Sequence, residues 1–145
     1  MDERESLIAR RILGVALDRM RDEPVVLLEG PRTVGKSTAL RALARRAGGE
    51  ILDVDNLATR DAVLKDPATI IAGSRLTCID EYQRAPSVLD AIKAELNRSS
   101  RPGQFVLTGS ARHESLPTAA QALSGRLHRM TVYPLAQSEV EGTAP

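Results

Sequence analysis

Residues 30–38 place two glycines, a lysine and two hydroxyl side chains at fixed spacing in the sequence GPRTVGKST. The segment fits the pattern G-x-x-x-x-G-K-[ST], in which the glycines let the chain turn back so that its N–H groups can hold phosphate oxygens. Lys36 adds a flexible positive charge for the β and γ phosphates, and Ser37 offers a hydroxyl ligand to Mg²⁺. The sequence therefore predicts a phosphate-binding loop for a nucleotide.

The alternative for this loop is a chance glycine-rich turn before a helix. An apolar run precedes the loop and an Ala- and Leu-rich stretch follows it, which is the strand-loop-helix context that the pattern requires. We expect the Lys36 side chain to face solvent until a ligand arrives, and Arg32 to touch either phosphate or only solvent. The residues expected to bind nucleotide are Gly30, Pro31, Arg32, Thr33, Val34, Gly35, Lys36, Ser37 and Thr38.

A second pair of candidates, Asp80 and Glu81, ends the segment LTCIDE at 76–81. In a parallel sheet, the loops beyond the carboxyl ends of the strands line the ligand crevice. Asp80 is therefore expected to reach Mg²⁺, and Glu81 to orient and activate a water molecule. An Asp-Glu pair after a strand is often only a solvated loop or a helix cap, so this assignment depends on the phosphate-binding loop. A glutamate directly after the aspartate favours hydrolysis of the nucleotide over transfer of its phosphoryl group to a second substrate.

Two further candidates each have an alternative explanation, and for Arg126 the helix-end explanation is favoured. Thr108 or Ser110, at the end of the run FVLTGS, is placed near the γ-phosphate or the attacking water, unless Thr-Gly-Ser only forms a turn. Arg126 follows a helix expected at 117–124, and it either complements the end of that helix or reaches the nucleotide of a neighbouring subunit as an arginine finger. Asp55 is expected to cap a helix.

Composition excludes several classes of function. Aromatic residues make up 2% of the chain, which argues against a platform for stacking single-stranded nucleic acid. The net charge of +1 gives no bulk electrostatic attraction to nucleic acid. The lone Cys78 cannot form an internal disulfide and is expected to be buried. No apolar run is long enough for a membrane helix, and no signal peptide is recognisable, so we expect a cytoplasmic protein.

Apolar runs alternate with helical stretches along all 145 residues, a length typical of one domain. Because the strands are separated by helices, we expect a parallel α/β sheet in three layers. Polar residues in the last strand place it at the sheet edge. The expected strands are 25–28, 51–54, 76–79, 105–108 and 127–132, and the expected helices are 5–20, 36–46, 57–65, 68–72, 87–97 and 117–124.

Six segments together resemble a family of bacterial and archaeal AAA-like P-loop ATPases that carry an uncharacterised C-terminal domain. The resemblance implies a RecA/AAA-type P-loop NTPase core with a five-stranded parallel sheet in the order 5-1-4-3-2. The resemblance implies the roles given above for Lys36, Ser37, Asp80 and Glu81. It also puts Ser110 or Thr108 near the sensor position of these ATPases. Arg126 falls where related ATPases carry an arginine finger. The segments are RRIL at 10–13, GPRTVGKST at 30–38, IDEYQRAP at 79–86, RPGQFVLTGSAR at 101–112, LSGR at 123–126 and YPLAQSE at 133–139.

These residues predict an ATPase that converts ATP and water to ADP and phosphate with Mg²⁺. The alternatives are a module that binds nucleotide with negligible turnover and, third, a small-molecule kinase. The expected catalytic residues are Glu81, Lys36, Ser110 and Arg126, and the expected metal ligands are Ser37 and Asp80.

The expected organisation is a helix at 1–23, an ATPase core at 24–140 and a tail at 141–145. Members of the resembled family are usually longer, so we expect that the helical lid and the C-terminal domain are absent here. That domain would set the protein or nucleic-acid partner. Its loss would expose apolar surface, which makes a homo-oligomer an expected partner state.

Overall fold

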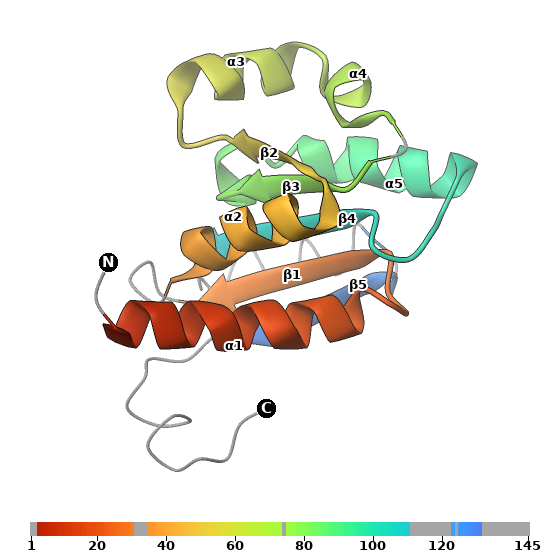
Figure 1. Cartoon of the computed structure of the whole chain (residues 1–145). Helices are drawn as coiled ribbons and strands as arrows, with labels where there is room; N and C mark the ends of the chain where they lie inside the picture. The colour runs from red at the N-terminus through yellow and green to blue at the C-terminus, as the bar shows by residue number, and fades with distance from the viewer. Residues whose placement is uncertain (1–2, 31–34, 74, 111–122, 124, 132–145) are drawn as a thin grey trace.

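The computed structural model describes residues 3–30, 35–73, 75–110, 123 and 125–131, with side chains from Arg10 onward. Figure 1 shows a sheet with helices on both faces. The helix expected at 117–124 lies almost entirely outside the described residues. The elements in chain order are α1 (Glu3–Arg19), β1 (Val25–Gly30), α2 (Lys36–Ala47), β2 (Glu50–Asp53), α3 (Leu57–Lys65), α4 (Pro67–Ile71), β3 (Thr77–Asp80), the 3-10 helix η1 (Tyr82–Arg84), α5 (Val88–Arg98), β4 (Phe105–Ser110) and β5 (Leu127–Thr131).

The five strands form one parallel sheet in the order β2-β3-β4-β1-β5. This is the predicted order read from the opposite edge, so the predicted fold class is confirmed. Parallel pairing brings the strand ends Gly30, Asp80 and Ser110 to the same end of the sheet, called the carboxyl end below. β5 lies at an edge, as its polar residues predicted.

Alternate residues of β1 pack into two separate cores. Val26 and Leu28 face the core built with α1 and α2, whereas Val25 and Leu27 face the core built with α3, α4 and α5. All six residues of β1 are buried, which explains its apolar run without alternation. Burial of each Val or Leu side chain contributes about 1.5–3 kcal/mol, so the two cores fix the strand that leads into the phosphate-binding loop.

Cys78 is completely buried on β3, as predicted. Burial raises the pKa of its thiol to about 12. The thiolate is the reactive form of cysteine, so this side chain is a small packing residue in the folded chain.

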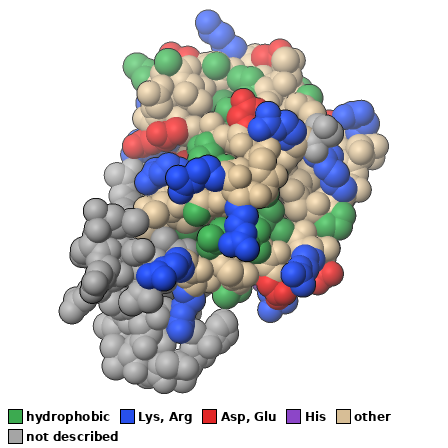
Figure 2. Space-filling view, viewed as in Figure 1, with side chains coloured by type: hydrophobic (Ala, Val, Ile, Leu, Met, Phe, Trp, Pro, Cys, Tyr) green, Lys and Arg blue, Asp and Glu red, His purple; other side chains and the backbone are tan. Residues whose placement is uncertain are grey.

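Most of the arginines on the described helices are exposed to solvent. The pairs Arg10-Arg11 and Arg45-Arg46 lie on helices; Arg10, Arg45 and Arg46 are exposed, whereas Arg11 is partly buried. Figure 2 shows Lys and Arg side chains standing singly or in small groups on the face that α1 and α2 cover, between apolar and uncharged atoms. Within the described ranges, every helix falls short of the length and apolarity that a membrane crossing requires.

The start of α3 corrects one prediction. Asn56, and not Asp55, is the N-cap: its backbone is extended and its Oδ1 accepts a hydrogen bond from the Thr59 N–H at 3.1 Å. Asp55 lies one residue too early for this contact and instead pairs with Arg84 at 3.5 Å. Both residue types are good caps, so composition alone could not fix the position.

Replacement of Asn56 by Ala should lower the free energy of unfolding by about 1 kcal/mol, because the first turn of α3 loses its capping acceptor. Asp55→Ala removes only a half-exposed ion pair and should change it by less than about 0.5 kcal/mol. Urea denaturation followed by circular dichroism measures both. Equal effects of the two substitutions would contradict the assignment of the cap.

Candidate functional site

The described ends of the expected phosphate-binding loop are Gly30, which ends β1, and Gly35, which directly precedes α2. Gly35 precedes α2 with φ 88° and ψ 18°, a left-handed conformation that glycine adopts without steric cost. Within the described residues, no side chain caps α2 and no acidic residue stands in its first turn. The free N–H groups at such a helix start bind anions. The four residues Pro31, Arg32, Thr33 and Val34 lie outside the described part of the chain.

Lys36 is buried rather than solvent-facing, so that prediction was wrong. Only 2% of the residue is exposed. Its Nζ donates to the carbonyl of Gly30 and, at 2.7 Å, to the carbonyl of Gly109. These carbonyls end the neighbouring strands β1 and β4, and they supply the ammonium group with acceptors inside the protein. An ammonium group cannot be buried without such partners.

Ser37 and Asp80 lie in contact. The Ser37 hydroxyl donates to Asp80 Oδ2 at 2.9 Å and approaches Oδ1 at 3.2 Å. Asp80 Oδ1 also accepts from the Thr108 hydroxyl at 2.5 Å. The described residues contain no cluster of three or more His, Cys, Asp or Glu able to hold a metal. Mg²⁺ commonly uses one or two protein oxygens together with water and phosphate, so a hydroxyl and a carboxylate fit it.

Glu81 has φ 61° and ψ 53°, and in the described part of the chain it is the one non-glycine residue with positive φ. Such a conformation costs about 1–3 kcal/mol and is concentrated at functional sites. The Glu81 N–H donates to Thr108 Oγ1 at 2.9 Å, which holds the backbone in place. Its side-chain Oε2 accepts from Gln83 Nε2 at 2.5 Å and from Ser110 Oγ at 3.3 Å.

Thr108 and Ser110 both belong to β4, so the alternative of a Thr-Gly-Ser turn is wrong. Thr108 is completely buried and bonds to Asp80 and to the backbone of Glu81. Ser110 is partly exposed and reaches the Glu81 carboxylate. The structure thus brings each hydroxyl to a different carboxylate.

Arg126 lies away from these groups. It directly precedes β5, at the end of the sheet opposite to the carboxyl end. Its guanidinium donates to Asn97 Oδ1 at 3.0 Å and to the Leu123 carbonyl at 3.4 Å. The helix that Arg126 was expected to follow lies almost entirely outside the described residues, so both alternatives for Arg126 stay predictions.

Comparison with known proteins identifies the family. Residues 22–141 match the family model described as AAA domain. The chain belongs to this family. Uncharacterised proteins of Mycobacterium bovis and Mycobacterium tuberculosis are each 34% identical to it over 142 residues, which cover 95% of this chain and 32% of theirs. The chain therefore spans about a third of the length of these curated relatives.

Solved structures support the same fold. DnaA from Aquifex aeolicus bound to AMPPCP has a TM-score of 0.60 at 15% identity, covering 98% of this chain and 53% of that one. A DNA replication initiation factor has a TM-score of 0.58 at 14% identity, covering 91% and 47%. At such identities the likeness concerns the fold alone. With the family and the fold together, the chain is a P-loop nucleotide-binding domain of the ATPase type.

Two residues of this AAA domain site escaped the sequence analysis. Gly109 leaves no room for a side chain, because a Cβ there would lie 2.7 Å from Tyr82 Cε1. Gln83 follows on η1 and donates to Glu81. A glycine inside a strand often marks a close approach of another segment, which is the signal that could have pointed to Gly109.

A buried carboxylate also lies one residue before the loop. Glu29 is 2% exposed, and its Oε1 accepts from Arg129 at 3.1 and 3.2 Å and from the Thr131 hydroxyl at 3.3 Å. These contacts join β1 to the edge strand β5 beside the phosphate-binding loop.

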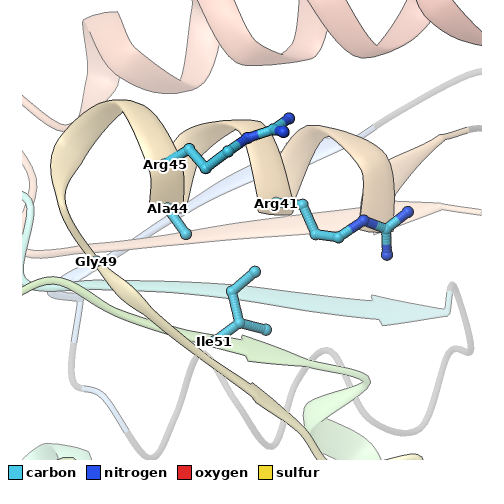
Figure 3. Close-up of a pocket in the computed structure, with 5 residues that line it drawn as sticks. All are labelled: Arg41, Ala44, Arg45, Gly49 and Ile51. Carbon is cyan, nitrogen blue, oxygen red and sulfur yellow. The ribbon is translucent and has the colours of Figure 1, made fainter.

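A separate pocket of about 400 Å³ lies between the second half of α2 and the start of β2. Figure 3 shows the Ile51 side chain pointing toward Ala44 on α2, while Arg41 and Arg45 extend from the same helix. The described residues that line the pocket carry two guanidinium groups and no carboxylate.

Gly109→Ala should destabilise the AAA domain by about 1–3 kcal/mol, because the new methyl group overlaps the buried Tyr82 ring. Gly14→Ala is the matched control, since a Cβ at that exposed position of α1 meets nothing within 4 Å. It should stabilise by about 0.5–1 kcal/mol through helix propensity. Thermal and urea unfolding measure both, and a neutral Gly109→Ala variant would show that η1 does not press on β4.

Proposed function

We propose that this AAA domain binds Mg-ATP at the carboxyl end of its sheet and hydrolyses it to ADP and phosphate. The observation that carries the proposal is the convergence of the uncapped start of α2, the Ser37–Asp80 contact and the carboxylate of Glu81. Lys36 and Ser37 begin α2, whereas Asp80 ends β3 and Glu81 follows it, so these residues are distant in the sequence and meet because of the sheet topology.

Binding uses groups that already point to this end of the sheet. Lys36 exchanges the carbonyls of Gly30 and Gly109 for oxygens of the β and γ phosphates. The N–H groups of the first turn of α2 and the positive end of the helix hold the same phosphates. The AMPPCP-bound DnaA structure shares this fold and supports a nucleotide as the ligand.

Ser37 and Asp80 are the residues proposed to hold Mg²⁺. Bound Mg²⁺ supplies positive charge to the β and γ phosphate oxygens. Thr108 fixes the Asp80 carboxylate through its hydrogen bond to Oδ1, and the Ser37 hydroxyl and the Asp80 carboxylate would be the oxygens offered to the metal.

Glu81 is the proposed general base. Its carboxylate takes a proton from a water molecule while the water oxygen bonds to the γ-phosphorus. The bond between that phosphorus and the β–γ bridging oxygen breaks, which leaves ADP and inorganic phosphate. Ser110 donates to Glu81 Oε2 and restrains the carboxylate. The glutamate follows Asp80 directly, so the base and the proposed metal ligand are held by the same strand end.

Lys36→Met should weaken Mg-ATP binding by about a hundredfold or more, because the phosphates lose their main positive charge while the side-chain volume is kept. Lys93→Met, on an exposed position of α5, should bind as the unchanged chain does. Titration calorimetry measures affinity, and circular dichroism checks folding because Lys36 is buried. Unchanged affinity in folded Lys36→Met would refute the phosphate-binding assignment.

Glu81→Gln should leave Mg-ATP affinity within a few-fold and lower the rate of phosphate release by about a hundredfold or more. The same chemical change at the exposed Glu50 is the control and should have no effect. Turnover in Glu81→Gln equal to that of the unchanged chain would remove Glu81 from the role of base. Tight binding with no phosphate release from the unchanged chain would instead favour the nucleotide-binding module.

A further inference from the structure

The hydrogen bonds to the Glu81 carboxylate are unevenly distributed. In the described part of the chain they all fall on Oε2, from Gln83 Nε2 at 2.5 Å and from Ser110 Oγ at 3.3 Å. Gln83 gives the shorter of the two contacts, and it stands only two residues along the chain on η1. A directional hydrogen bond from an amide donor restrains the rotation of the carboxylate as well as its place.

The local structure holds this contact at a cost. Glu81 adopts a left-handed backbone conformation, which turns the chain from β3 into η1. The Gln83 Oε1 atom is buried without a hydrogen-bond partner among the described residues. A buried amide oxygen without a partner is unfavourable. These two unfavourable features lie within three residues of each other, on the two residues that form the contact, and features of this kind are concentrated at functional sites.

We propose that Gln83 is a positioning residue for hydrolysis. Together with Ser110 it holds Oε2 of Glu81, so that the other carboxylate oxygen is presented to the attacking water. The inference rests on the proposed function, in which Glu81 is the base. An amide suits this task because it donates a hydrogen bond without charge. A lysine or arginine would form an ion pair with the base and compete with the proton for it, and a carboxylate would repel it.

The amino-acid change that tests this is Gln83→Met, which keeps the length of the side chain and removes the donor. We expect kcat to fall about tenfold or more with an unchanged Kd for Mg-ATP, because the base is misoriented only for the chemical step. Gln104→Met is the matched control. Gln104 is buried and Gln83 partly buried, and the Gln104 amide joins Ser99 and Arg101 at the opposite end of the sheet, so kcat should not change.

A double-mutant cycle separates positioning from structural support. If Gln83 acts through Glu81, Gln83→Met should cause no further loss in single-turnover phosphate release when Glu81 is already Gln. A purely structural role would lower the rate by the same factor in both backgrounds, and that result overturns the inference. Unchanged kcat in Gln83→Met alone overturns it as well.

Two further results keep the test decisive. Should Gln83→Met fail to fold, the isosteric Gln83→Glu variant replaces the donor with an oxygen and tests the same contact. A wild-type chain that binds Mg-ATP without releasing phosphate would overturn the proposed hydrolysis and this inference together. A wild-type chain that hydrolyses ATP, with a Gln83 variant that matches it, would overturn the inference alone.

Discussion

The hydrogen bonds to the Asp80 carboxylate are the interaction on which the site depends. Ser37 on α2 and Thr108 on β4 donate to it from 43 residues before and 28 residues after in the sequence. A carboxylate with 9% of its residue surface exposed is stable only with such partners. The partners are available because parallel pairing aligns the ends of β1, β3 and β4. The hydrogen bonds to Asp80 therefore depend on the order of the strands in the sheet. The bond from Ser37 also ties the start of α2 to β3.

Buried charged residues are concentrated at the carboxyl end of the sheet. Lys36, Asp80, Glu81 and Glu29 are all buried there, each with hydrogen-bond partners. Buried charges contribute little net stability even when paired, because desolvation offsets their attraction. The stability of the AAA domain must come from the two apolar cores on either face of the sheet. The sheet interior can then be apolar while its carboxyl end is reserved for ligands.

How far sequence predicts this structure depends on the range of each interaction. Strands and helices are predicted from local sequence signals, and in the described residues they lie where they were expected. The phosphate-binding pattern is also a local signal. The strand order, in contrast, was predicted from the family resemblance. The burial of Lys36 depends on a carbonyl 73 residues away, so no local pattern carries it. The cap at Asn56 was missed by one residue, because two adjacent good capping residues differ only in backbone angles. Glu81, which accepts the Gln83 contact, has a positive φ that its residue type does not suggest.

Gly109 connects the binding half of the site to its catalytic half. Its carbonyl accepts from Lys36, and its missing side chain lets Tyr82 and Gln83 approach β4. In the proposed reaction, Lys36 leaves the Gly109 carbonyl when phosphate binds. The end of β4, which packs against η1, then loses its contact with the Lys36 ammonium group. Ser110, the next residue, donates to the same oxygen of Glu81 that Gln83 holds. A change in phosphate occupancy is therefore one peptide unit away from the groups that orient the base. Within the proposed function, the carbonyl that Lys36 would leave and the hydroxyl that restrains Glu81 belong to adjacent residues of β4.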